Sequence, residues 1–252
     1  MSYDPRQILT QAGKDIAVEE VPLRQIADQF GTPCYVYSAQ ALRAQYHQLA
    51  AALNPLKSRI HYSVKANSNL GILTLFKELG AGFDIVSGGE LSRVLAIGGN
   101  PRDVIFSGVG KSIAEIDLAL KVGVGCFNVE SRSELERVQQ RAELAQKVAP
   151  ISVRVNPDID ANTHPYISTG LKDNKFGVDA ETALTLYSMA AKTNALSIEG
   201  IDCHIGSQIA RTEPLLEALN SILNLVDTLS SSGIELQHVN LGGGFGVRYQ
   251  DE

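Results

Sequence analysis

The sequence predicts an α/β protein of the (β/α)8 barrel class, truncated after about the seventh strand. Three observations lead to this prediction. From about residue 59 onward, short apolar runs alternate with amphipathic segments of helical period. The first runs recur roughly every 20–25 residues, which is the spacing of βα units with short connections. Reactive polar residues follow several of the runs, as at the catalytic face of a barrel. A doubly wound open sheet is the alternative that the same alternation allows.

The elements follow one another in a simple order. Seven parallel strands are expected at residues 59–64, 82–86, 103–108, 125–129, 151–156, 198–206 and 236–244. Helices are expected at residues 71–80, 88–99, 111–123, 131–148, 179–193 and 213–233. Ser87 is placed as an N-cap, and Ser131 with Glu134 three residues later has the spacing of a capping box.

The two ends of the chain complicate a complete barrel. Residues 1–37 precede the first unit, and the segment that follows Gly31, "TPCYVYS", resembles a strand that pairs outside the barrel. Seven strands cannot close a barrel, because two of them would keep unpaired backbone groups. We therefore expect a fragment of a longer protein, with an N-terminal segment at residues 1–37 and an incomplete barrel at residues 38–252.

Composition excludes several classes of function. The net charge of −6 and the pI near 5.4 argue against a nucleic-acid surface, which needs a basic face. No apolar run approaches the roughly 18–20 residues that span a bilayer, and the polar N-terminus is no secretory signal, so we expect a cytoplasmic protein. Cys34, Cys126 and Cys203 are widely spaced and odd in number, which indicates reduced cysteines and no metal site.

The strand ends carry the residues that suggest chemistry. They are Lys65 at the end of the first strand, Asp84 and Ser87 at the end of the second, Arg154 and Asn156 at the end of the fifth, His204 and Ser207 at the end of the sixth, and Gly242, Gly243 and Gly244 at the end of the seventh. A long segment at residues 156–178, which contains Thr163, His164, Lys172, Lys175 and Phe176, suits a lid over a substrate.

Together these residues predict a site for pyridoxal 5′-phosphate. The three glycines can turn with positive φ and direct backbone N–H groups at an anion, and Ser207 adds a hydroxyl donor. Lys65, expected at the end of a buried strand, can form a Schiff base with a carbonyl. A Schiff-base lysine beside a phosphate site suggests this cofactor, with His204 stacked on its ring and Arg154 holding the imidazole.

Each of these residues also has an ordinary structural explanation. A glycine turn can serve close packing, a strand histidine is often a core residue, Arg154 can simply pair with an acidic neighbour, and a lone lysine often only snorkels. The segment "IFSGVGKS" at residues 105–112 resembles a phosphate-binding P-loop, but Ile105 occupies the position where that motif requires glycine.

Six motifs in order resemble the diaminopimelate decarboxylases, enzymes with an alanine-racemase-like barrel that binds pyridoxal phosphate. The motifs are "YSVKANSN", "GFDIVSGGEL", "RVNPDID", "HPYISTGLKDNKFGV", "CHIGSQI" and "LGGGFGV", and they span nearly the whole chain.

This resemblance implies a role for each candidate residue. Lys65 would carry the cofactor and His204 would stack on its ring. Ser207 and Gly242–Gly244 would hold the phosphate, Asp84 and Arg154 would support the lysine and the histidine, and the region around Phe176 would cover the substrate. The implied reaction releases CO2 from the amino acid meso-2,6-diaminopimelate to give L-lysine, in a homodimer of the full-length form.

The resemblance also implies parts that do not occur up to Glu252. These are an acidic residue in a Glu-Pro-Gly-Arg pattern and a C-terminal β domain with a proton-donor cysteine. We therefore expect residues 1–37 to belong partly to that β domain, and the 252-residue chain alone to be poorly stable and inactive. An ornithine or arginine decarboxylase and a non-catalytic single-barrel cofactor carrier remain as alternatives.

Overall fold

The computed structural model describes residues 8–12, 15–159 and 176–247. The chain divides into two units. Residues 1–62 and 71–82 belong to the first unit, and residues 63–70 and 83–252 belong to the second.

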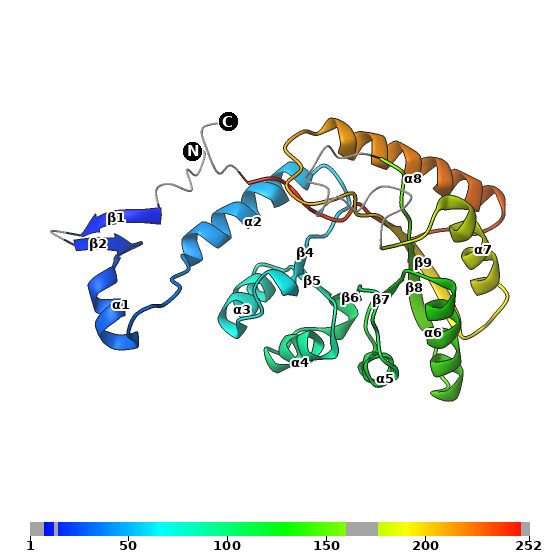
Figure 1. Cartoon of the computed structure of the whole chain (residues 1–252), viewed down its shortest axis with the longest axis horizontal. Helices are drawn as coiled ribbons and strands as arrows, with labels where there is room; N and C mark the ends of the chain where they lie inside the picture. Colours follow the sequence, from blue (N-terminus) through cyan, green and yellow to red (C-terminus); the bar gives the residue numbers. More distant parts are fainter. Residues whose placement is uncertain (1–7, 13–14, 160–175, 248–252) are drawn as a thin grey trace. The chain divides into compact units, whose positions relative to one another are not determined.

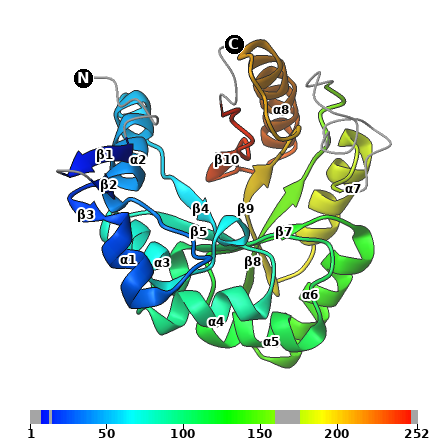
Figure 2. The ribbon, with the colours of Figure 1, turned by 60° about the vertical axis from the view of Figure 1, so that its left-hand side comes forward.

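The first unit opens with a small antiparallel sheet. Strands β1 (Leu9–Ala12), β2 (Asp15–Val18) and β3 (Val21–Pro22) pair in that order, and α1 (Leu23–Phe30) follows (Figure 1 and Figure 2). Helix α2 (Ala39–Leu53) starts at Ser38, whose Oγ accepts a hydrogen bond from Ala41 N at 3.0 Å. Neither this sheet nor α2 was predicted from the sequence.

The expected strand after Gly31 is wrong. Residues 31–38 contain no strand, and the side chain of Tyr35 in this segment is 91% exposed. Pro33 cannot donate to a strand ladder, and β1, β2 and β3 supply the sheet of this region instead. The first unit also includes most of α3 (Leu70–Glu78), where Phe76 stacks on Tyr62 with ring centroids 4.1 Å apart.

Seven strands form the main sheet, in the order β10-β9-β8-β7-β6-β5-β4. The bounds are β4 (His61–Ser63), β5 (Gly82–Ile85), β6 (Val104–Phe106), β7 (Cys126–Val129), β8 (Ala149–Arg154), β9 (Leu196–Asp202) and β10 (His238–Asn240). The pairs from β5 to β10 are parallel. The order follows the chain without a reversal, which a doubly wound sheet would require, so the prediction of a truncated (β/α)8 barrel is confirmed.

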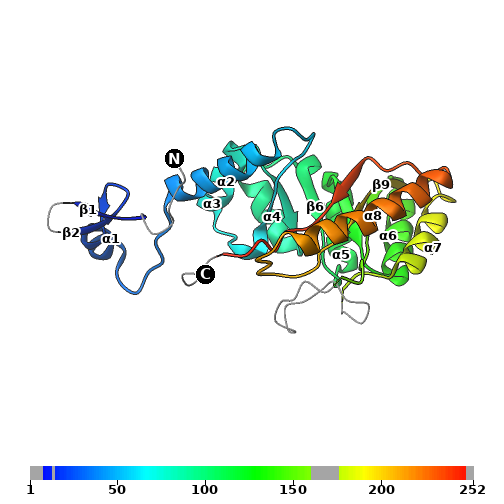
Figure 3. The ribbon, with the colours of Figure 1, turned by 90° about the horizontal axis from the view of Figure 1, so that it is seen from above.

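Helices cover the outer face of this curled sheet (Figure 2). They are α4 (Gly88–Ala96), α5 (Ile113–Val122), α6 (Arg132–Leu144), α7 (Ala180–Ala190) and α8 (Glu213–Ser231), and α8 runs along the β9–β10 end (Figure 3). The core between sheet and helices is apolar. Its fully buried side chains include Phe83, Phe106, Phe127, Leu91, Ile116, Leu135, Ile151 and Leu186. Among the described residues no helix combines the length and apolar character needed to cross a membrane.

The helix starts confirm one capping prediction and modify another. Ser87 accepts a hydrogen bond from Glu90 N at 3.2 Å, as predicted. Ser131 accepts from Glu134 N at 3.2 Å, but the Glu134 carboxylate does not return to Ser131. It accepts from Glu130 N instead, because its other oxygen pairs with a buried lysine. The complete capping box belongs to α5 and was not predicted.

Candidate active site

Lys65 lies directly after β4, in the 3-10 turn Val64–Ala66. Val64 is fully buried, while Lys65 is exposed. The expectation of a buried strand lysine is therefore wrong: the strand ends at Ser63, and the tight turn places Val64 in the core and Lys65 outside it. An exposed amine at this position is accessible to a reaction partner.

Asp84 on β5 lies beside Lys65 and accepts two hydroxyl hydrogen bonds. Ser107 Oγ donates to Asp84 Oδ1 at 2.5 Å, and Ser63 Oγ donates to Oδ2 at 3.3 Å. Burial raises the pKa of Asp84, and the Ser107 hydrogen bond and the positive charge of Lys65 oppose that rise. Asn128 Nδ2 donates to Ser107 Oγ at 3.1 Å, which fixes the hydroxyl that Asp84 uses.

Arg154 ends β8 among acidic and aromatic side chains. Its Nη1 lies 3.3 Å from Glu130 Oε2, and its Nε lies 3.9 Å from Asp202 Oδ2. The guanidinium carbon lies 5.5 Å from the centre of the Phe176 ring. Burial raises the pKa of Asp202 to about 7, although the charge of Arg154 opposes this. Arg154 therefore has the acidic neighbours that its ordinary structural explanation requires.

His204 follows β9 rather than lying within it. Burial lowers the pKa of His204 to about 4, and the charges of Arg154 and Lys65 act in the same direction. The imidazole is therefore neutral at pH 7. Gly243 N donates to His204 Nδ1 at 3.3 Å, which assigns the proton of the neutral ring to Nε2.

The glycine run packs against the loop of His204. A Cβ on Gly242, which has φ of +71°, would lie 2.7 Å from both Cys203 O and His204 Nδ1. The loops after β9 and β10 are also bonded to each other, because Ile209 N donates to Gly244 O at 2.9 Å and Gly246 N donates to Ile209 O at 3.0 Å. Glycine at these positions therefore permits a close approach of two backbones.

The backbone N–H groups of the three glycines were expected to point at an anion, but two of them bind other groups of the protein. Gly242 N donates to Asn240 Oδ1 at 2.8 Å, and Gly243 N is engaged by His204. Gly244 and the exposed hydroxyl of Ser207 remain as groups that can face an anion. A side chain added at Gly243 would meet nothing within 4 Å, so the space beside the turn is open.

The long segment after β8 is described only at its two ends. Thr163, His164, Lys172 and Lys175 lie outside the described residues. After this segment the chain returns to the end of β8, where Val178 N donates to the Arg154 carbonyl at 3.0 Å. This return places Phe176 on the Arg154 guanidinium.

Four site residues were missed in the sequence. Ser107, Asn128, Glu130 and Asp202 all lie at the ends of buried strands or directly after them. This is the rule that identified Asp84 and Arg154, so position alone could have identified the four. What the sequence lacked was their pairing, because each binds a residue of a different strand.

Lys111, from the segment that resembles a P-loop, has a structural role. Its side chain is 0% exposed, and its Nζ lies 2.6 Å from Glu134 Oε1. It also donates to Gly108 O and Asn128 O, each at 2.7 Å. All three ammonium protons have a protein acceptor, so this lysine has no donor left for a phosphate.

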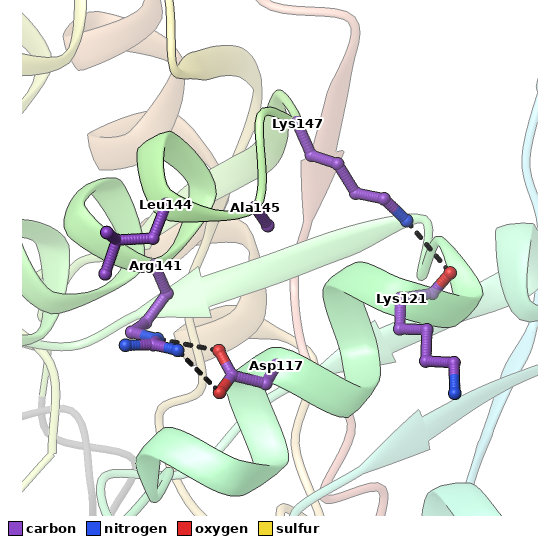
Figure 4. A pocket seen from close by; sticks show the side chains of 6 residues that line it. All are labelled: Asp117, Lys121, Arg141, Leu144, Ala145 and Lys147. Carbon is purple, nitrogen blue, oxygen red and sulfur yellow. Dashed lines mark hydrogen bonds and ion pairs between the residues drawn. The ribbon is translucent and has the colours of Figure 1, made fainter.

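A cavity of about 280 Å³ lies between α5 and α6, lined by Asp117, Lys121, Arg141, Leu144, Ala145 and Lys147 (Figure 4). Arg141 binds Asp117 through two hydrogen bonds of 2.7 and 2.8 Å, and Lys147 Nζ donates to two carbonyls at the end of α5. The cavity lies at the C-terminal ends of these helices, whereas the candidate site lies at the C-terminal ends of the strands. It does not belong to that site.

The comparisons with known proteins agree with this geometry. Residues 39–252 match the family described as "Pyridoxal-dependent decarboxylase, pyridoxal binding domain". The chain is 56% identical over 239 residues to a diaminopimelate decarboxylase of Pseudomonas aeruginosa, covering 94% of this chain and 57% of that protein. It is 57% identical over 237 residues to one of Neisseria meningitidis, covering 93% of this chain and 56% of that protein.

A solved structure shows the same fold. The diaminopimelate decarboxylase of Helicobacter pylori, determined in complex with L-lysine, superposes with a TM-score of 0.89 at 42% identity, covering 91% of this chain and 58% of that chain. The chain thus spans somewhat more than half the length of these relatives. With a family match over residues 39–252, the chain belongs to the pyridoxal-dependent decarboxylases, in which it forms the pyridoxal-binding domain.

Proposed function

We propose that the chain is the cofactor-binding part of an enzyme that decarboxylates meso-2,6-diaminopimelate to L-lysine and CO2, the last step of lysine biosynthesis. The observation that carries this proposal is the 56% identity to a diaminopimelate decarboxylase over 94% of the chain. The L-lysine in the related Helicobacter pylori structure is consistent with this reaction, since L-lysine is the proposed product.

The described residues fit pyridoxal 5′-phosphate at two separate places. Lys65 offers an exposed amine, and Asp84 beside it offers a carboxylate. At a second place, where the backbones of two loops meet, open space lies beside Gly243 and the hydroxyl of Ser207 is exposed. The cofactor supplies an aldehyde that bonds to amines and a ring that accepts the electron pair left by departing CO2.

Each candidate residue of the site then has a proposed role. Lys65 would hold the cofactor covalently, and Asp84 would keep the amine in place through charge. His204 presents a neutral flat ring at pH 7, because its pKa is about 4, and can stack without adding a positive charge. Arg154 helps to keep that ring neutral, and Ser207 with the Gly242–Gly244 turn would bind the phosphate.

The covalent role of Lys65 can be tested directly. The protein, expressed from its complete reading frame and loaded with pyridoxal phosphate, is reduced with borohydride, digested and mapped by mass spectrometry. We expect the added mass on Lys65. Labelling of another lysine, Lys111 for example, would refute the assignment of the site.

The substrate is tested by turnover. The same protein is assayed for CO2 release with meso-diaminopimelate, ornithine and arginine. We expect faster turnover of diaminopimelate than of ornithine or arginine. We also propose that the enzyme is a cytoplasmic homodimer and that its substrate is a free amino acid. Preference for ornithine or arginine would assign the alternative decarboxylase, and cofactor binding without any turnover would assign the carrier.

A further inference from the structure

Glu130 is a buried carboxylate directly after β7, and it contacts both neighbouring strand ends. Its side chain is 1% exposed. Oε1 accepts a hydrogen bond from Gly108 N at 3.0 Å, in the loop after β6, and Oε2 lies 3.3 Å from Arg154 Nη1, at the end of β8. Since β7 lies between β6 and β8 in the sheet, this one side chain bridges two strands that do not touch each other.

The backbone of Glu130 is itself held by a hydrogen bond to a neighbouring side chain. Its backbone N–H donates to Glu134 Oε2 at 2.8 Å, and Glu134 Oε1 holds Lys111. Lys111 in turn donates to Gly108 O at 2.7 Å. Gly108 is therefore held on its carbonyl by Lys111 and on its amide by Glu130.

The two partners of Glu130 lead to the two halves of the candidate site. Ser107 precedes Gly108, and its hydroxyl donates to Asp84, the carboxylate beside Lys65. Arg154 is one of two cations, with Lys65, whose charge lowers the pKa of His204. The path from Asp84 through Ser107, Gly108 and Glu130 to Arg154 is continuous.

On this geometry we propose that Glu130 is a positioning residue that holds the Ser107–Gly108 turn and Arg154 at a fixed separation, and so aligns the lysine half of the site with the histidine half. The proposal rests on the proposed function for its meaning in catalysis. Asp202 also faces Arg154, but at 3.9 Å, so Glu130 is the closer carboxylate.

Glu130→Gln separates the two contacts. The amide oxygen can still accept from Gly108 N, while the amide NH2 faces the Arg154 guanidinium, donor against donor. Glu130→Asp keeps the charge but is too short to reach both partners, so it provides a second variant if the first does not fold. Glu136→Gln is the control, because Glu136 is 52% exposed and binds only Arg132 among the described hydrogen bonds.

The first measurement uses the cofactor-free protein. The imidazole of His204 is titrated by NMR and assigned with His204→Gln. Burial is the larger cause of the low pKa of His204 and stays in place in both variants. We therefore expect Glu130→Gln and Glu130→Asp to raise that pKa only in part, because Arg154 moves away from the ring. If Arg154 stayed in place, loss of the Glu130 charge would leave that pKa unchanged or lower it, and this result would overturn the proposal.

The second measurement is a double-mutant cycle on pyridoxal phosphate affinity, with Glu130→Gln, Arg154→Gln and both. We expect Glu130→Gln to weaken binding about tenfold, the order of a lost charge-assisted hydrogen bond. The double variant should be no weaker than Arg154→Gln alone, whereas additive losses would show independent action and refute the proposal. If the unaltered protein binds no cofactor, the proposed function fails, and the His204 titration still decides the role of Glu130.

Discussion

Replacing Lys111 by methionine tests whether this lysine supports the fold or binds a ligand. Methionine keeps most of the apolar stem but removes the ammonium group. In the structure that group makes three hydrogen bonds of 2.6–2.7 Å, one of them to the buried carboxylate of Glu134. Both partners of this ion pair are shielded from water, with side chains 0% and 4% exposed.

The expected cost follows from that burial. Removing one partner of a buried ion pair costs about 3–5 kcal/mol, because the remaining charge loses its compensation. For a chain of this size, about 1 kcal/mol lowers Tm by roughly 2–4 °C, so Lys111→Met should lower Tm by roughly 6–20 °C. The contrast is Arg132→Met, which removes the exposed Arg132–Glu136 pair and should cost at most about 0.5 kcal/mol.

The assay is thermal unfolding followed by circular dichroism, with both variants and the unaltered protein measured in the same buffer. A drop for Lys111→Met no larger than that for Arg132→Met would refute the structural role. Weaker phosphate binding at unchanged stability would instead support the P-loop resemblance that the structure argues against.

Three further outcomes are expected. Gly244→Ala places a Cβ onto a backbone carbonyl at φ of +82° and should lower Tm and cofactor affinity, whereas Gly243→Ala meets nothing within 4 Å and should leave Tm unchanged; equal Tm values would contradict this reasoning. His204 has a folded pKa near 4, below its usual value of about 6.5, so the unfolded chain binds the proton first and stability should fall as pH falls through this range. In urea titrations at several pH values, the change of unfolding free energy with pH should be smaller in His204→Gln than in the unaltered protein. Parallel curves would exclude a contribution of His204 to this pH dependence. Ser112→Ala removes the capping box with Glu115 and should cost about 1 kcal/mol in the same urea assay, so an unchanged midpoint would argue against the cap.

The barrel could be predicted because its signal is local. Each apolar run such as "GFDIV" is followed by an amphipathic helix, and both periods are read from neighbouring residues. The small sheet at residues 9–22 was missed because its strands are only four, four and two residues long. For β10 the prediction was too long, since the glycine run turns away from the sheet at once and leaves a strand of three residues.

The candidate site also has features that the sequence could predict and features that it could not. Lys65, Asp84, Arg154 and His204 could be named as candidates because strand ends converge in a parallel barrel. The exposure of Lys65 was not predictable from alternation, because a 3-10 turn interrupts the strand at Val64. Nor could the sequence show that the Glu134 carboxylate would pair with a lysine of another βα unit and leave the capping box incomplete, because this pairing depends on distances in the folded structure.

The distribution of charge supports the proposal that a phosphate binds at the backbone of the glycine turn. Near Lys65 and Arg154, the structure places three carboxylates, Asp84, Glu130 and Asp202. These carboxylates offset the attraction that Lys65 and Arg154 would otherwise exert on a phosphate. The two bonded loops, residues 206–210 and 241–247, contain no charged side chain at all, so they attract an anion only through hydroxyl and amide dipoles. Such dipoles act over short distances, so the proposed anion binding would depend on the close approach of the two backbones, which a Cβ at Gly242 or Gly244 would prevent.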